Sequence, residues 1–134
     1  MEWQDCAGHT RKVTPNTDKI NSIVKAAEVR RRIVQSGVFD DDTASAIAVD
    51  YYEVVKLLLT ALLEREGYKS DNHTCLVDYF KHKYPDKSYE TAIMDQLRII
   101  RNRASYEGVL ISKEYIERNK LEIEYIIDLL RELL

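Results

Sequence analysis

Residues that form turns are scarce in this 134-residue chain, which contains only four glycines and two prolines. Together they reach less than half of the roughly 12 % that these two residues make up in an average protein. A β-sandwich or a β-barrel needs many tight turns, so the scarcity favours few and long elements, which here means helices. At ~100–200 residues per domain, we expect a single domain, 1–134, in which residues 1–16 form an irregular lead-in.

The chain also lacks the features of secreted, membrane-spanning and strongly basic proteins. Two cysteines, Cys6 and Cys75, are too few for a small scaffold held by disulfides, and they favour a reducing compartment. No apolar run approaches the ~20 residues of a membrane span, and the N-terminus has no signal-peptide pattern. The formal net charge of -3 excludes a strongly basic nucleic-acid binder, although it allows a local basic patch. The sequence therefore predicts a cytoplasmic protein without membrane contact.

Apolar residues recur at helical spacing through most of the chain. The pattern predicts helices over 17–36, from the aspartates at 40–42 to Gly67, over 70–83, from 87–88 to Gly108, and from Ser112 onward. The second helix is apolar over so wide an arc that it belongs at the centre of a bundle. Short loops place neighbouring helices antiparallel. The predicted fold class is therefore all-α, an up-and-down bundle of four to five antiparallel helices, and no segment is expected to pair as a strand.

Polar residues at the expected helix starts can accept hydrogen bonds from the first backbone N–H groups. We expect Asn16 or Thr17 to cap the first helix, Ser70 or Asp71 the third and Ser112 the last. Glycines at 37, 67 and 108 are expected to end the helices that precede them.

The fourth predicted helix ends in a basic cluster within the segment DQLRIIRNRASYEG. One helical face carries Arg98, Arg101, Asn102 and Ser105, and Arg103 stands in the same turn. Guanidinium groups bind phosphate oxygens in a planar fork, and an asparagine adds a donor and an acceptor for a base edge or a sugar hydroxyl. The pattern indicates a phosphate or nucleotide site. The alternative is a charged face paired with carboxylates of a neighbouring helix.

Tyr106 lies at the end of the same predicted helix. It shares a face with Asn102, but it stands about 140° round a regular helix from Arg101. We therefore expect Arg101 and Tyr106 to converge only where the helix frays or across a dimer. A second basic run, at 30–32, could extend a phosphate-binding surface, but a solvated face is the expected interpretation.

The segment LRIIRNRASYEG resembles the signature of the HEPN superfamily, named for higher-eukaryote and prokaryote nucleotide-binding domains. In that family an Arg, usually followed by Asn, and a His a few residues later stand at the end of an inner helix. The stretch YYEVVKLLLTALLEREGYKSDNHTCL is also similar to the family, with an aromatic-rich helix, a leucine-rich end, a glycine and a loop histidine before the next helix. The resemblance covers roughly residues 17–134.

The resemblance implies a helical bundle, often a homodimer, whose motifs face one another across a cleft. Many members are metal-independent ribonucleases, and several are toxins encoded beside a minimal nucleotidyltransferase that silences them. In those enzymes the Arg holds the scissile phosphate, and the His handles the proton when the 2′-hydroxyl attacks. Carried over to this chain, Arg101 matches the motif Arg and Asn102 its usual neighbour, while Tyr106 occupies the position of the His.

The tyrosine in this position leaves ribonuclease activity open. A phenol, which ionises near pH 10 in a free peptide, is a poor general base, although it can donate a hydrogen bond or stack on a nucleobase. His73 matches the loop histidine of the family and could replace the missing catalytic histidine, but capping or packing is its expected role. The spacing of Cys75, Asp78 and His82 could align metal ligands, yet no second cluster completes the set except His73 or the distant Cys6 and His9, so a partly buried cysteine beside surface polar residues is the expected interpretation. Neither a metal nor a cofactor is therefore expected.

Three interpretations are left open. In the first, the chain is a HEPN-like homodimer that binds RNA or a nucleotide, alone or with a nucleotidyltransferase partner in a toxin–antitoxin or defence system. Its catalytic or central binding residues are Arg101, Asn102 and Tyr106, and its further RNA contacts are Arg98, Arg103 and Ser105. In the second, the bundle is a non-catalytic module that uses the cleft to hold a partner protein. In the third, it is an unrelated bundle with a salt-bridged helix end.

Overall fold

The computed structural model describes residues 2–134 and is mostly helical. Within that range the α-helices are, in chain order, α1 (Thr17–Ser36), α2 (Ala44–Arg65), α3 (His73–Lys83), α4 (Ser88–Tyr106) and α5 (Lys113–Leu133). A 3₁₀-helix, η1 (Trp3–His9), and two short strands, β1 (Thr10–Lys12) and β2 (Tyr68–Ser70), accompany them. The all-α prediction is confirmed. None of these helices combines the length and the apolar character that crossing a bilayer requires.

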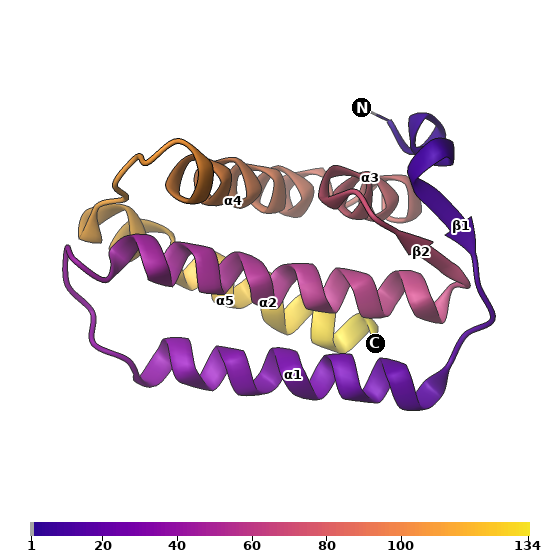
Figure 1. Ribbon diagram of the computed structural model, residues 1–134, viewed down its shortest axis with the longest axis horizontal. Helices are drawn as coiled ribbons and strands as arrows, with labels where there is room; N and C mark the ends of the chain where they lie inside the picture. The colour runs from indigo at the N-terminus through magenta and orange to yellow at the C-terminus, as the bar shows by residue number, and fades with distance from the viewer. Residues whose placement is uncertain (1) are drawn as a thin grey trace.

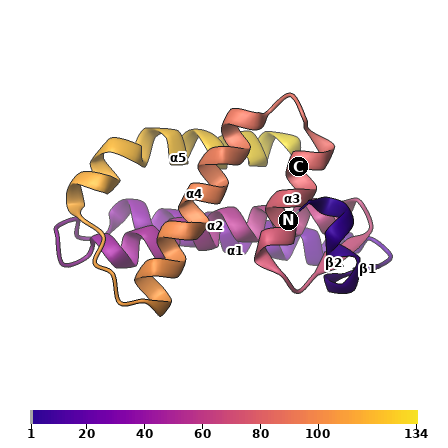
Figure 2. The same cartoon turned by 90° about the horizontal axis from the view of Figure 1, so that it is seen from above.

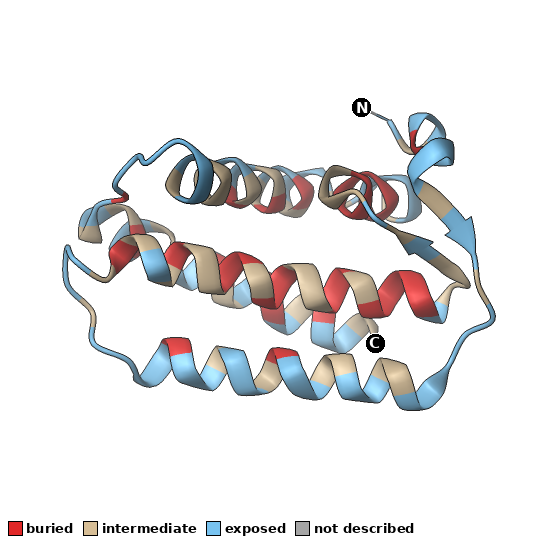
Figure 3. Ribbon diagram, viewed as in Figure 1, coloured by how far each residue is buried: buried red, intermediate tan, exposed pale blue. Residues whose placement is uncertain are grey.

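Helix α2 forms the centre of the bundle, as its sequence predicts. Figure 1 shows α1 on one side of α2 and α3 with α4 on the other, and α2 contacts all four of the other α-helices. Seen from above, α4 crosses over α2 (Figure 2). The buried residues gather along α2, whereas α1 is largely exposed (Figure 3). Because α2 is covered on several sides, most of its apolar side chains lie in the core, among them Tyr51, Val54, Val55, Leu58, Leu59 and Leu62.

Local sequence signals set most of the helix ends. The side chains of Asn16 and Ser112 accept hydrogen bonds from the backbone N–H groups three positions on, as expected of N-caps. Gly67 and Gly108 follow α2 and α4 with φ values of 87° and 67°, in the left-handed region that glycine enters without a steric cost. The expected caps of the third helix are wrong, because Asn72 accepts the N-cap hydrogen bonds of α3.

The N-terminal segment is not the irregular lead-in that its polar sequence suggests. Strand β1 pairs antiparallel with β2, with Thr10 opposite Ser70 and Lys12 opposite Tyr68. The indole of Trp3 packs edge-on against Tyr68, at 5.8 Å between ring centroids. The predicted helix over 70–83 therefore starts later, at α3, because the backbone around Ser70 is used for pairing with β1. The expectation that no segment pairs as a strand is wrong for the same reason.

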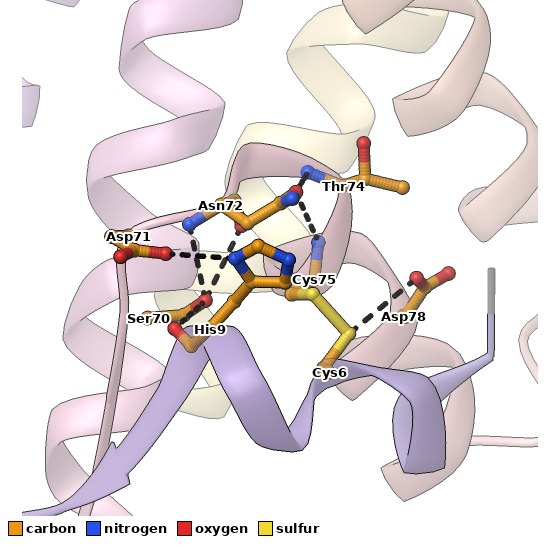
Figure 4. Close-up of polar contacts among 8 residues, drawn as sticks. All are labelled: Cys6, His9, Ser70, Asp71, Asn72, Thr74, Cys75 and Asp78. Carbon is orange, nitrogen blue, oxygen red and sulfur yellow. Dashed lines mark hydrogen bonds and ion pairs between the residues drawn. A yellow bond between two sulfur atoms is a disulfide. The ribbon is translucent and has the colours of Figure 1, made fainter.

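A disulfide between Cys6 and Cys75 joins η1 to the first turn of α3 (Figure 4). The two Cα atoms are 5.8 Å apart, although 69 positions separate the cysteines in the sequence. Asp78 lies one turn further along α3, with its Oδ2 atom 3.9 Å from the Cys6 sulfur. Burial raises the pKa of Asp78. The disulfide corrects the expectation of two reduced cysteines, since only folding brings the two segments together.

In the basic run at 30–32, Arg30 and Arg32 are exposed, as expected of a solvated face, and only Arg31 is partly buried. Arg31 extends from α1 to Glu124 on α5 and donates to its carboxylate from Nε at 2.8 Å. The same carboxylate accepts from the hydroxyl of Tyr51 on α2 at 2.7 Å and from the amide of Gln35 at 3.1 Å. This carboxylate therefore ties three helices together.

Candidate functional site

The predicted site at the end of α4 is organised around Arg101, whose side chain turns inward to α2. Its Nη2 donates to Glu53 Oε1 at 3.1 Å. Its Nη1 donates to the hydroxyl of Tyr106 at 2.9 Å and to Asn102 Oδ1 at 3.2 Å. The side chain is only 12 % exposed. The structure thus brings the three predicted central residues together, but in this monomer the guanidinium bridges two helices instead of facing an open groove.

The contact between Arg101 and Tyr106 corrects the expectation that they meet only at a frayed helix end or across a dimer. Helix α4 extends through Tyr106, and the two residues still meet within one chain. Both side chains are long enough to close the angle between them, and the guanidinium carbon lies 5.2 Å from the centroid of the phenol ring. Tyr106 is 72 % exposed, so its ring covers Arg101 from the solvent side.

Tyr52 forms the inner wall of this site. The guanidinium carbon of Arg101 lies 5.5 Å from the centroid of the Tyr52 ring, and the ring of His73 lies 6.1 Å from that centroid. Burial raises the pKa of Tyr52 to about 12, although the positive charges of Arg98 and Arg101 act against the rise. Tyr52 is therefore a neutral, apolar support that the arginine and the histidine share.

Glu53 holds the arginine in place. It accepts from Arg101 and forms an ion pair with Lys56 at 2.9 Å. Burial alone would raise the pKa of the Glu53 carboxyl, but the hydrogen bond and charge of Lys56 and the charge of Arg101 outweigh it, so the pKa is lowered. The carboxylate is charged at neutral pH. Any anionic ligand of Arg101 must therefore displace it or share the guanidinium with it.

The remaining predicted residues lie around this centre. Arg98, one turn before Arg101, pairs with Asp95 on its own helix at 2.9 Å. Arg98, Asp95 and Lys81 line a groove of about 380 Å³ between α3 and α4. Arg103 and Ser105 are exposed, and within residues 2–134 neither forms a hydrogen bond or an ion pair with the side chains around Arg101. The proposed face of α4 is thus divided into an inward part and an exposed part.

Helix α2 supplies Tyr52, Glu53 and Lys56 to the site, a contribution that the motif at the end of α4 does not indicate. A signal for it exists: Glu53 and Lys56 are the only charged residues in the segment 51–63. Charges inside such an apolar helix need partners, because an unpaired buried charge is costly. The pattern indicates that a charged side chain from another helix meets them, but it does not indicate which one.

One N–H group of Arg101 is not used within the fold. The Nε atom is buried and has no hydrogen-bond partner among residues 2–134. Buried donors without an acceptor are rare in native proteins, and such an N–H group at a cationic side chain favours an external oxygen acceptor. Arg98, Arg101 and Lys56 also outnumber their carboxylate partners Glu53 and Asp95. The site therefore carries an excess of positive charge, which suits an anion.

The described residues offer one group of potential metal ligands, formed by Cys6, Cys75 and Asp78. The sulfur atoms of this group are bonded to each other, so they supply no thiolate. No protein-family model matches the chain, and neither curated proteins nor solved structures give a match.

Proposed function

We propose that the protein is a HEPN-like domain that binds RNA or a nucleotide through the site around Arg101. The observation that carries this proposal is a guanidinium held by Glu53, Asn102 and Tyr106 that still has an N–H group without an acceptor. A phosphate oxygen is a suitable acceptor, since arginine binds phosphate in a planar, charge-assisted geometry. The resemblance of LRIIRNRASYEG to the HEPN signature supports the same ligand class.

Each residue at the end of α4 has a role in this proposal. Arg101 binds the phosphate, and Asn102 offers its amide to a sugar hydroxyl or a base edge. Tyr106, which is exposed and hydrogen-bonded to Arg101, offers a ring on which a base can stack. We assign contacts with neighbouring backbone phosphates to Arg103 and Ser105, which are exposed, and to Arg98, which lines the groove between α3 and α4.

The biological setting follows the family resemblance. We propose that the protein is a metal-independent ribonuclease, acting in a toxin–antitoxin or defence system with a minimal nucleotidyltransferase as partner. The support for this setting is the HEPN-like segment alone.

The end of α4 also has the character of a protein interface. Beside Tyr106, the loop into α5 exposes Val109 at 44 % and Leu110 at 88 %. Exposed apolar side chains at the rim of a polar site are typical of association surfaces. We propose that a second copy of the chain covers them, which would place two Arg101 sites close together. A non-catalytic module that binds another protein through the same residues is the second candidate function.

Replacing Arg101 with alanine is expected to weaken RNA binding by about 10- to 100-fold, because a charge-assisted contact contributes about 1.5–3 kcal/mol. The slope of the logarithm of the binding constant against the logarithm of the salt concentration should become shallower by about one, since the variant neutralises one fewer phosphate. Fluorescence anisotropy with a labelled structured RNA, measured in EDTA over a series of salt concentrations, tests both effects.

Two further variants serve as a control and as a change with the opposite expected effect on affinity. Arg118→Ala removes the same charge from an exposed position on α5 and should leave the affinity within about twofold. Glu53→Gln removes the carboxylate that competes for Arg101, so binding should tighten by about three- to tenfold, the effect of removing one partly screened repulsion. Equal affinities for the wild type and Arg101→Ala would rule out the proposed site. In that case, capture of a protein partner through Leu110 would favour the second candidate function.

A further inference from the structure

His73 lies at the meeting point of α2, α3 and α4, beside the site of Arg101. It is the first residue of α3, and Asn72 makes the N-cap hydrogen bonds of that helix, so the imidazole is not needed for capping. Its ring is 6.1 Å from the ring of Tyr52, the same ring that the Arg101 guanidinium approaches at 5.5 Å. Of the two expected roles, capping is therefore wrong, whereas packing is confirmed by the contact with Tyr52, which places the imidazole next to the candidate phosphate site.

The charges that face His73 come from two helices. Lys56 and Glu53 act on it from α2, and Arg101 and Arg98 act on it from α4. Burial lowers the pKa of the imidazole, and the three cations lower it further, while Glu53 alone acts in the opposite direction. Its place in the first turn of α3 also disfavours a positive charge. At neutral pH the ring is therefore uncharged, which is the form that accepts a proton.

We propose that His73 is the general base of an RNA-cleavage reaction at this site, accepting the proton of a ribose 2′-hydroxyl while Arg101 holds the adjacent phosphate. This inference rests on the proposed function, and it assigns the proton-transfer role that the tyrosine at position 106 leaves vacant. Arg98 and Lys56, whose charges also act on His73, add to the positive charge that the site offers to a phosphate. Tyr106 then keeps a binding role, with its hydroxyl hydrogen-bonded to Arg101.

The proposed cleavage step needs no reactant other than the RNA and water. The 2′-oxygen forms a bond to phosphorus as its proton passes to the imidazole of His73. The bond from phosphorus to the 5′-oxygen breaks, and that oxygen takes a proton from water. The products are a 2′,3′-cyclic phosphate and a 5′-hydroxyl. The protonated His73 returns its proton to the solvent, and its lowered pKa makes this return easy at neutral pH.

The test is single-turnover cleavage of a structured RNA in EDTA by the wild type, His73→Asn and His82→Asn. The wild type is expected to cleave, and His73→Asn should lose at least about 100-fold in rate, the usual contribution of a positioned general base. RNA affinity should stay within about twofold, because a neutral side chain is replaced by a neutral one. His82 lies on the same helix, exposed and stacked against Trp3, and its replacement should leave the rate unchanged.

Two readouts separate proton transfer from a purely structural role. The wild-type rate at sub-saturating RNA should rise with pH to a plateau, with its midpoint below 6.5, because this profile reports the free protein, in which the pKa of His73 is lowered from that value. His73→Gly should regain activity when imidazole is added to the buffer, whereas a structural defect would not respond. The melting temperature of each variant shows whether it folds, and His73→Gln provides a second test of the same position if His73→Asn does not fold.

Three results would overturn the assignment of His73. One is wild-type cleavage rates in His73→Asn and His73→Gln. Another is a wild type that binds RNA through Arg101 but cleaves none, which would leave the binding proposal intact. The third is a wild type that neither binds nor cleaves RNA, which would overturn the proposed function as well.

Discussion

Reduction of the disulfide between Cys6 and Cys75 is expected to lower the free energy of unfolding by about 4 kcal/mol. The bond closes a loop of 69 positions, and a cross-link over so long a loop removes much of the conformational freedom of the unfolded chain. For a domain of this size, the loss corresponds to a fall in melting temperature of about 15 °C. Thermal unfolding followed by circular dichroism, with and without a reductant, measures it.

The matched control is a chain in which both Cys6 and Cys75 are replaced with serine. It should melt close to the reduced wild type and should not respond to the reductant. Cys75 anchors the disulfide in the first turn of α3, two positions after His73. Loss of the bond should therefore loosen the start of α3 before the rest of the bundle. A wild type whose melting temperature is the same in both conditions would contradict the expectation.

Replacing Glu124 with alanine is expected to cost about 3 kcal/mol of stability. Its carboxylate accepts hydrogen bonds from Tyr51 and Arg31, and the variant leaves the buried Tyr51 hydroxyl without this acceptor. It also leaves Arg31 with Asp128 as its remaining carboxylate partner, and breaking a partly buried pair on one side is costly. Urea unfolding at pH 7 measures the change, and Glu124→Gln, which retains an acceptor oxygen, should cost less.

The same carboxylate should make the stability depend on pH. Burial acts to raise the pKa of Glu124, but the hydrogen bonds from Tyr51, Arg31 and Gln35 outweigh it, so the folded-state pKa lies below the ordinary value of 4.5. A lowered pKa means that this stabilisation is complete above pH 4.5 and is lost as the pH falls through the folded-state value. Glu124→Gln should lack this part of the acid dependence. If the stability of the wild type and of Glu124→Gln fell equally as the pH is lowered, Glu124 would not be the source of this acid dependence.

The helices could be predicted from the sequence, and the reason is local. Helical spacing in the segment 47–63 identifies α2 as the central helix, and Asn16, Ser112 and Gly108 act on backbone groups within a few positions of themselves. The presence of Arg101, Asn102 and Tyr106 at one helix end could be predicted in the same way. Their convergence within one chain could not, because helical geometry describes where a side chain starts and not how far it reaches.

Contacts between distant segments were decided only by the tertiary structure. Arg101 meets Glu53 across 48 positions, and Arg31 meets Glu124 across 93 positions. Cysteine spacing gives no reason to join Cys6 to Cys75, and the polar segment 10–12 shows no strand pattern until β2 lies beside it. In sequence, a charged residue on a helix looks the same whether water or a carboxylate from another helix surrounds it. Periodicity therefore determined the bundle, whereas packing determined which side chains share the site.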